Sequence, residues 1–281
     1  MLTITAMLIF AAHDAMIKVL TAGLAVPQIL WIRFIFFTSF ALIMARRTGP
    51  LKLSLRSARP VLQIGRSLML LLDMVLFVIA VGLLPLADTH ALIASFPLIV
   101  TALSVPILGE KVGVRRWLAV AVCFLGVLLI LRPGLTVLQP GSLVALGVAV
   151  AFAFYNVMTR IVGRYDSGEV SPVYVGIVGL LVTSFIAPFY WVPPTADQWI
   201  LLAIIGVTGA TAHFLLITAL KAAPASVLQP FNYTLLLAAT VIGYLVFGQF
   251  PDFWTITGAA VIVGSGLYVI QRERSLKRQA G

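Results

Sequence analysis

Apolar residues in this chain form long continuous runs that short polar connections separate. The runs lie at about 2–20, 27–45, 61–83, 86–108, 116–131, 142–162, 172–192, 198–220, 225–247 and 253–270. A helix needs about 20 apolar residues to cross the roughly 30 Å hydrocarbon core of a bilayer. The runs are continuously apolar rather than alternating, which favours helices over the strands of a membrane barrel. The pattern predicts an all-α integral membrane protein with ten transmembrane helices.

The composition excludes an ordinary soluble domain. The chain is 61% hydrophobic and 10% charged, whereas soluble chains carry roughly 25% charged residues. Its net charge of +10 raises the question of a nucleic-acid partner, which the distribution of the charges answers. Of the 19 basic residues, 16 lie in the even-numbered connections and the C-terminal tail: Arg46, Arg47, Lys52, Arg56, Arg59, Arg66, Lys111, Arg115, Arg116, Arg160, Arg164, Lys221, Arg272, Arg274, Lys277 and Arg278.

The odd-numbered connections hold only two basic residues, Lys18 and Arg132, and three of them carry an aspartate with no basic residue: Asp88, Asp197 and Asp252. Basic residues concentrate in the cytoplasmic connections of membrane proteins. We therefore predict that both termini are cytoplasmic and that the net charge reflects this topology rather than a nucleic-acid partner. The protein is expected to contact the lipid bilayer and to cross the inner (cytoplasmic) membrane.

The two halves of the chain are related. At an offset of 139 residues, Pro85 aligns with Pro224 and Gly109 with Gly248. Each half holds five predicted spans, and an odd number makes the second half enter the membrane from the opposite side, as in the inverted repeats of secondary transporters. The predicted organisation is a first five-helix repeat at 1–132, a linker at 133–140, a second repeat at 141–271 and a basic cytoplasmic tail at 272–281.

Sequence motifs in each half resemble a known family. The first copy runs from Leu84-Pro85-Leu86-Ala87 to Leu108-Gly109-Glu110 and continues with Trp117 and Gly126-Val127. The second copy runs from Ala223-Pro224-Ala225-Ser226 to Gly248-Gln249 and continues with Trp254 and Gly264, with Gln249 where the family usually has Glu. Over essentially its whole length, the chain resembles the EamA domains of the drug/metabolite transporter superfamily, and most of all the amino-acid exporters of the YddG type.

The resemblance implies a fold and an activity. Such proteins are ten-helix exporters of small metabolites, often amino acids, and they enclose a central cavity. The hairpins of helices 3–4 and 8–9 are thought to open and close that cavity. The motifs identify a scaffold and leave the ligand open.

Polar side chains inside the predicted spans indicate where the cavity lies. A charge at the centre of a bilayer costs about 2.5–3.5 kcal/mol on insertion scales, so it is usually paired, hydrated or functional. The candidate cavity residues are His13, Asp14, Asp73, His90, Thr101, Tyr155, Asn156, His213, Gln229, Asn232 and Tyr233. The candidate structural or gating residues are Lys18, Arg33, Pro97 and Pro230.

Several of these residues allow two interpretations. Asp14 and Lys18 are four residues apart on one helical face, the spacing of a local ion pair, which is either structural or part of a binding site. Arg33 is expected to be tied to Asp73 or to backbone carbonyls rather than to substrate. Asp73 and His213 lie near the predicted pseudo-axis and form either a proton relay or a satisfied buried pair.

Proline predicts helix kinks beside the cavity. Pro97 and Pro230 occupy related spans, and each removes a backbone N–H, so each span is expected to bend and expose a carbonyl.

The motifs of other activities are missing from the sequence. It has no Gly-x-x-x-x-Gly-Lys-Ser/Thr loop for ATP, and neither a His-Glu-x-x-His motif nor a cysteine pair for a metal. We predict no enzyme activity, no metal and no cofactor. The predicted function is a secondary transporter, taken as a monomer, that exports amino acids, aromatic ones included, by alternating access.

The alternatives are export of cationic drugs, export of nucleotide sugars, and a passive channel. A nucleotide-sugar carrier needs several basic residues in its cavity for phosphate, and only Lys18 and Arg33 are available.

Overall fold

The computed structural model describes residues 1–109, 112–131, 140–222, 228 and 231–279, without the side chains of 116, 217, 220–222 and 273–279. Throughout these residues the secondary structure is helical and contains no strand. The helices are α1 (Leu2–Leu20), α2 (Val26–Thr48), α3 (Leu51–Ser54), α4 (Pro60–Leu83), α5 (Leu86–Ile93), α6 (Phe96–Leu108), α7 (Val114–Leu131), α8 (Pro140–Val162), α9 (Val170–Ile186), the 3-10 helix η1 (Ala187–Tyr190), α10 (Ala196–Ala222), α12 (Thr234–Phe247) and α13 (Phe253–Gln279).

Eight helical segments are long and apolar enough to cross a membrane, with α5 and α6 together forming one of them at Leu86–Leu108. Two further apolar helices, Trp117–Leu131 and Thr234–Phe247, are shorter. The protein is therefore an all-α, multi-pass membrane protein. The count of ten spans and the cytoplasmic placement of both termini remain predictions.

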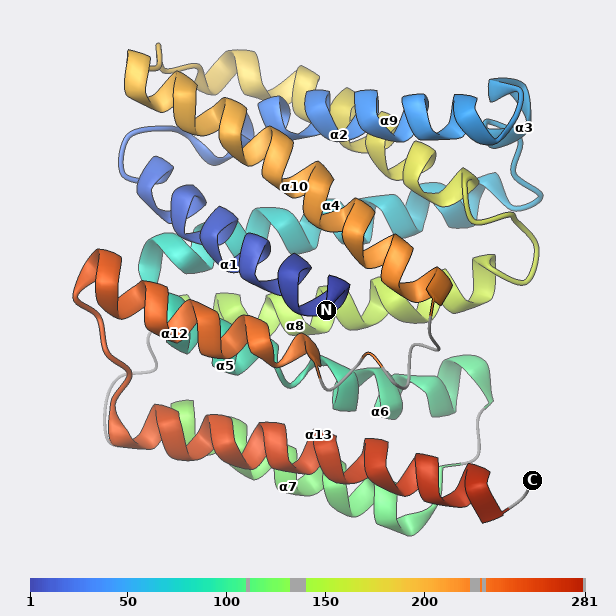
Figure 1. Cartoon of the computed structure of the whole chain (residues 1–281), viewed down its shortest axis with the longest axis vertical. Coiled ribbons are helices and arrows are strands. Elements are labelled where there is room, and N and C mark those ends of the chain that lie inside the picture. The colour runs from blue at the N-terminus through green and yellow to red at the C-terminus, as the bar shows by residue number, and fades with distance from the viewer. Residues whose placement is uncertain (110–111, 132–139, 223–227, 229–230, 280–281) are drawn as a thin grey trace.

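The helices lie side by side and run roughly parallel or antiparallel to one another (Figure 1). The most extensive packing joins α4 to α8, α7 to α13, α1 to α10, and α2 to α9, followed by α1 with α12 and α6 with α8. When each helix is replaced by the equivalent helix of the other half, every one of these pairs becomes another pair of the set or itself. The α4–α8 pair corresponds to α10–α1 and the α1–α12 pair to α8–α6, while α7–α13 and α2–α9 correspond to themselves. That is the packing expected of two five-helix repeats about a pseudo-two-fold axis.

Two glycines that align in the sequence end equivalent helices. Gly109 follows α6 with φ 68°, and Gly248 follows α12 with φ 65°. Only glycine adopts this left-handed conformation without strain, and in this position its N–H bonds to carbonyls of the last helical turn. The repeat therefore extends from sequence to backbone conformation.

The span at 86–108 is broken near its middle. Pro97 has no N–H, so the carbonyl of Ile93 loses the partner that it would have in a continuous helix. The chain turns at Ala94 and Ser95, where Ser95 Oγ donates a hydrogen bond of 2.7 Å to the carbonyl of Leu92. The predicted kink at Pro97 is present, whereas Pro230 lies outside the described residues.

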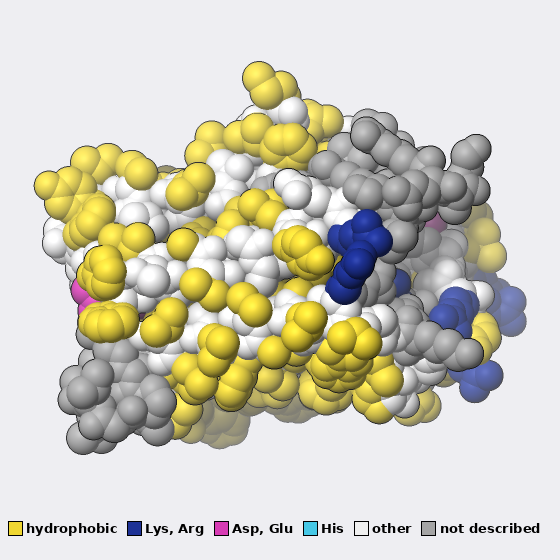
Figure 2. Space-filling view, turned by 90° about the horizontal axis from the view of Figure 1, so that it is seen from below, with side chains coloured by type: hydrophobic (Ala, Val, Ile, Leu, Met, Phe, Trp, Pro, Cys, Tyr) yellow, Lys and Arg dark blue, Asp and Glu magenta, His cyan; other side chains and the backbone are white. Residues whose placement is uncertain are grey.

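The outer surface of the bundle is apolar. Large apolar side chains such as Phe185, Leu245 and Phe253 are mostly exposed, as expected where lipid is the solvent. Figure 2 shows apolar side chains over the face seen from below, with the visible Lys and Arg side chains gathered toward one end of the bundle. The sequence predicts such a concentration of basic residues at one end of the bundle.

Candidate substrate cavity

A cavity of about 300 Å³ lies inside the bundle between helices of both halves. Its lining comes from α1, α2, α4, α5, α6, α8, α10, α12 and the residues just before α12: Met7, Phe10, Asp14, Arg33, Leu70, Asp73, Met74, Phe77, His90, Ile93, Ala94, Phe96, Pro97, Val148, Phe152, His213, Leu216, Asn232, Tyr233, Leu235 and Leu236. This volume is at the lower end of the roughly 300–1,000 Å³ that small-molecule sites occupy. The helix break at Ala94 and Pro97 forms part of the wall.

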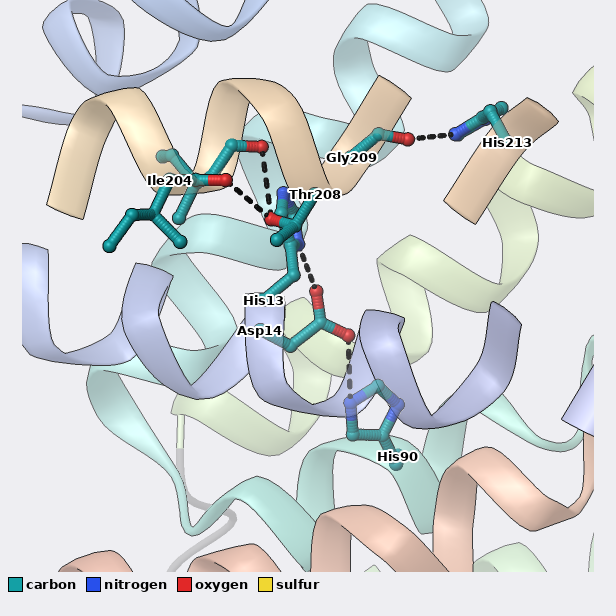
Figure 3. A network of polar contacts seen from close by, with 8 residues as sticks. His13, Asp14, His90, Ile204, Thr208, Gly209 and His213 are labelled. Atoms are coloured by element: carbon teal, nitrogen blue, oxygen red, sulfur yellow. Dashed lines mark hydrogen bonds and ion pairs between the residues drawn. The ribbon is translucent and has the colours of Figure 1, made fainter. Parts of the chain in front are cut away.

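Asp14 connects two helices through a pair of imidazoles. Its Oδ1 is 3.0 Å from Nδ1 of His13, the neighbouring residue on α1, and its Oδ2 is 3.3 Å from Nε2 of His90 on α5 (Figure 3). His13 is 0% exposed and His90 5%. Because a buried carboxylate without partners is very costly, the two imidazoles make this position tenable for Asp14.

A glycine on α10 makes room for this cluster. A Cβ added to Gly209 would lie 3.3 Å from Nε2 of His13, so a side chain there would crowd the imidazole. The carbonyl of the same glycine is 3.2 Å from Nδ1 of His213, whose ring packs edge-on against Phe10 and Phe37. Figure 3 shows His213 on the same helix as Gly209, apart from the Asp14 cluster.

Arg33 on α2 and Asp73 on α4 bring further charges to the cavity wall. Arg33 is attracted electrostatically by both Asp14 and Asp73, but no ion pair joins it to Asp73 in the part of the chain that the structure describes. The described lining thus combines one guanidinium with two carboxylates. Most of the remaining wall is apolar, so these charges are weakly screened.

Aromatic rings form a second component of the wall. Phe96 on α6 meets Phe152 on α8 edge-on with ring centroids 4.8 Å apart, and Phe77 lies 5.7 Å from the ring of His90. Aromatic rings stack on planar ligands and attract cations to their faces. The cavity can therefore hold a ring and charged groups together.

Comparison with known proteins identifies the scaffold. The family model of the EamA-like transporter family matches residues 1–132 and 139–271. The chain belongs to this family. The EamA-like match includes both halves of the chain and agrees with the resemblance recognised from the sequence motifs.

Three relatives are known as carriers of small molecules. An S-adenosylmethionine uptake transporter of Rickettsia bellii is 28% identical over 94% of this chain and 90% of its own length. A riboflavin transporter of Vibrio cholerae is 34% identical over 69% of this chain and 66% of its own length. A pseudopaline exporter of Pseudomonas aeruginosa is 27% identical over 94% of this chain and 92% of its own length. The EamA-like chain is accordingly a small-molecule transporter and not an enzyme.

Most of the candidate residues that the sequence indicated line this cavity. The described lining includes Asp14, Arg33, Asp73, His90, Pro97, His213, Asn232 and Tyr233. Gln229 and Pro230 lie outside the described residues. The structure therefore brings eight of the fifteen candidates together around one cavity, and their role in binding a substrate remains a prediction.

Four candidates lie off the cavity wall. His13 is not part of the described lining, and its Nδ1 lies 3.0 Å from Oδ1 of Asp14. Thr101 donates its hydroxyl hydrogen to the carbonyl of Pro97, and Asn156 donates an amide hydrogen to the carbonyl of Phe152. Tyr155 is also absent from the lining and accepts a hydrogen bond from Arg66. Each of the four thus has a polar contact within the bundle, although Nε2 of His13 is buried without a hydrogen-bond partner in the described structure.

The expected pairing of Lys18 with Asp14 is wrong. Nζ of Lys18 donates hydrogen bonds of 2.5 Å to the carbonyls of Val81 and Leu84, while Asp14 is held by His13 and His90. The reason is that the end of α4 offers carbonyls without helical partners, which bind a cation well.

Sequence reasoning missed Arg66, which it counted among the connection charges. The side chain is only 1% exposed and lies inside α4, nearly two turns after the start of the helix at Pro60. A signal was present: Gln63, Arg66 and Ser67 place three polar residues at helical spacing in an otherwise apolar run, which is unusual for a span that faces lipid.

Proposed function

We propose that this EamA-like protein transports small zwitterionic metabolites that carry an aromatic or heteroaromatic ring. The observation that carries the proposal is the composition of the cavity wall, which contains Arg33, Asp14 and Asp73 together with aromatic rings. A charged solute must leave water to cross the membrane, so its charges need partners of opposite sign inside the protein.

Each part of such a substrate has a matching group in the cavity. The planar guanidinium of Arg33 suits a carboxylate, which it binds with two parallel hydrogen bonds. Asp73 and Asp14 suit an ammonium or another cation. Phe96 and Phe152 offer faces and edges to a ring. Amino acids, aromatic ones included, are the simplest molecules with this set of groups, and their export remains the specific prediction within this class.

S-adenosylmethionine is a second candidate, which the charge count of the cavity favours. The molecule carries an ammonium, a sulfonium, a carboxylate and an adenine ring. Its two cations and one anion can pair with the two acidic side chains and the one guanidinium of the described wall. The name of the Rickettsia bellii relative agrees with this candidate. A nucleotide sugar fits less well, because Arg33 is the only Lys or Arg in the described lining.

We further propose that transport follows alternating access between two inverted five-helix repeats. The symmetric set of helix pairs and the matching ends at Gly109 and Gly248 support this mechanism. Export was predicted from the sequence, and the relatives include carriers named for uptake and for export. Direction therefore has to be measured.

The decisive experiment is counterflow in proteoliposomes. Vesicles containing the purified protein are loaded with unlabelled phenylalanine, tryptophan or S-adenosylmethionine and diluted into the labelled compound. We expect saturable, trans-stimulated uptake of at least one of these probes. Saturable counterflow for none of them would refute the proposal, and flux without saturation or trans-stimulation would indicate a channel.

Variants that remove one charge test the role assigned to each charged side chain of the cavity. Removal of one charge-assisted hydrogen bond costs about 1.5–3 kcal/mol, so Arg33→Gln should raise the half-saturation concentration by about 10- to 100-fold for every probe. Asp73→Asn should affect S-adenosylmethionine more than phenylalanine. Asp197→Asn, which changes an exposed acid at the start of α10, is the matched control and should transport like the wild type.

A further inference from the structure

A polar network surrounds Arg66 near the beginning of α4. We call it the Arg66 network, and it comprises Gln63, Arg66, Tyr155, Thr159, Asp166 and Ser171. Nη2 of Arg66 donates to the carbonyl of Ser171 at 2.8 Å, Nε to Oε1 of Gln63 at 3.3 Å, and Nη1 to the hydroxyls of Tyr155 and Thr159 at 3.2 Å each. The network connects α4 of the first half with α8 and α9 of the second.

Asp166, in the connection between α8 and α9, completes the network at the end of the bundle. Its carboxylate accepts hydrogen bonds from the Ser57 hydroxyl, the Ala58 amide and Nε2 of Gln63. Burial acts to raise the pKa of Asp166, but these hydrogen bonds and the charge of Arg66 outweigh it and lower the pKa below the ordinary value. The acid is therefore ionised at neutral pH and holds Gln63 in place for Arg66.

Tyr155 receives two contacts from one guanidinium. Besides the hydrogen bond to its hydroxyl, the guanidinium carbon lies 5.0 Å from the centre of its ring. A hydroxyl contact alone fixes the position of the ring, and a face contact in addition fixes its tilt. The planar fork of arginine can make both contacts at once, which the compact ammonium of lysine cannot.

The ring of Tyr155 passes this constraint to the cavity. It stacks on Phe152 with centroids 5.8 Å apart and an angle of 18° between the planes, and Phe152 meets Phe96 edge-on at 4.8 Å. Both phenylalanines line the cavity, whereas Arg66 and Tyr155 do not. A continuous series of contacts thus leads from a buried cation to the aromatic wall.

We propose that Arg66 is a positioning residue of the transport site, which sets the tilt of Phe152 through Tyr155 and thereby favours substrates with a planar ring. The role in selectivity rests on the proposed function, since it needs a transported substrate. A purely structural Arg66 would stabilise the bundle without changing which substrates it prefers. The two roles are therefore separable by measurement.

The first experiment measures ring selectivity in counterflow. Inhibition constants of unlabelled tryptophan and leucine are determined against whichever labelled probe the protein carries. In Arg66→Lys and in Tyr155→Phe we expect the preference for tryptophan over leucine to fall about two- to tenfold, the size of one aromatic contact. The maximal rate should change less than the half-saturation concentration.

Thr159→Val is the matched control. It also removes a hydroxyl partner of Arg66 from α8, but Thr159 has no ring contact with the wall. Its stability is expected to fall as in Tyr155→Phe, while the tryptophan preference remains that of the wild type. An unchanged preference in Arg66→Lys and Tyr155→Phe, or the same loss in Thr159→Val, would overturn the inference.

The second experiment needs no substrate. A 4-fluorophenylalanine is placed at position 152 by nonsense suppression, and its ¹⁹F resonance is compared among the wild type, Arg66→Lys and Thr159→Val. We expect the resonance to shift or split only in Arg66→Lys. An unaltered resonance overturns the positioning role whatever transport shows. A shifted resonance without counterflow of any probe supports the positioning of Phe152 and refutes the proposed function alone.

Discussion

Lys18 connects three helices near the C-terminal end of α1. Its ammonium donates 2.5 Å hydrogen bonds to the carbonyls of Val81 and Leu84 at the end of α4, and it lies 5.6 Å from the ring centre of Phe247 at the end of α12. The contacts join α1, α4 and α12. If the cavity opens at this end by separation of α1 from α4, these hydrogen bonds have to break.

Lys18→Met removes the cation and keeps most of the side-chain length. Hydrogen bonds to charged groups contribute about 1.5–3 kcal/mol each. Much of this is offset here because Lys18 is only partly buried and regains water when the end opens. A net loss of about 1–2 kcal/mol corresponds to a factor of about 5–30 in an equilibrium constant. We expect the population that is open at this end to rise by that factor.

Cysteine labelling measures this population. The chain has a single cysteine, Cys123, so Cys123→Ala gives a background in which Ile93→Cys places a reporter on the cavity wall. A membrane-impermeant thiol reagent is applied to either side of oriented proteoliposomes. Lys18→Met should label about 5–30 times faster from the side of Lys18 than the background does.

Lys18→Arg is the control because it keeps a cation in reach of the same carbonyls, and its labelling rate should stay near that of the background. Equal labelling rates in Lys18→Met and the background would refute the idea that the hydrogen bonds of Lys18 stabilise the closed state at this end. So would faster labelling from the opposite side.

Two further predictions concern stability. Gly258→Ala places a Cβ 2.6 Å from the carbonyl oxygen of Gly126, where α13 packs on α7. A Cβ at Gly264, on the same helix, has nothing within 4 Å. In thermal unfolding, Gly258→Ala should be destabilised by about 1–3 kcal/mol, and the stability of Gly264→Ala should be unchanged or slightly raised. The lowered pKa of Asp166 means that its contribution to stability is present above the ordinary pKa of about 3.9 and is lost as the pH falls through the lower folded value. Asp166→Asn should therefore lower the unfolding temperature at pH 7 and weaken its further fall between pH 4 and pH 2, and an unchanged acid dependence would contradict the network.

The spans and their interruptions were predictable from local sequence. A continuous apolar run indicates directly that a helix is surrounded by lipid. Pro97, Gly109 and Gly248 act through the backbone of their own helices. These effects need no knowledge of distant segments. The run near 116–131 shows the limit, because it is shorter than the roughly 20 apolar residues that a span needs.

The partners of the polar groups were not predictable in the same way. The spacing of Asp14 and Lys18 suggested a pair worth about 0.2–0.5 kcal/mol on an isolated helix. In the bundle, two free carbonyls on α4 and the imidazole of His90 offer stronger alternatives. Arg66 was misread for a related reason, since its partners belong to α8 and α9, far away in the sequence. The sequence shows which groups are polar, but the packing decides what each of them contacts.

The two cations that hold the bundle together differ in how readily their contacts break. Lys18 is partly buried and has two described hydrogen bonds, both to backbone carbonyls that water can solvate. Arg66 is almost fully buried and has four hydrogen bonds to groups on three helices. Exposure of its network therefore costs more, so we expect α4, α8 and α9 to move as one unit while α1 and α12 separate from it. A substrate bound in the cavity would then meet the ring of Phe152 in every state, whereas any contact with Asp14, which lies on α1, would change during transport.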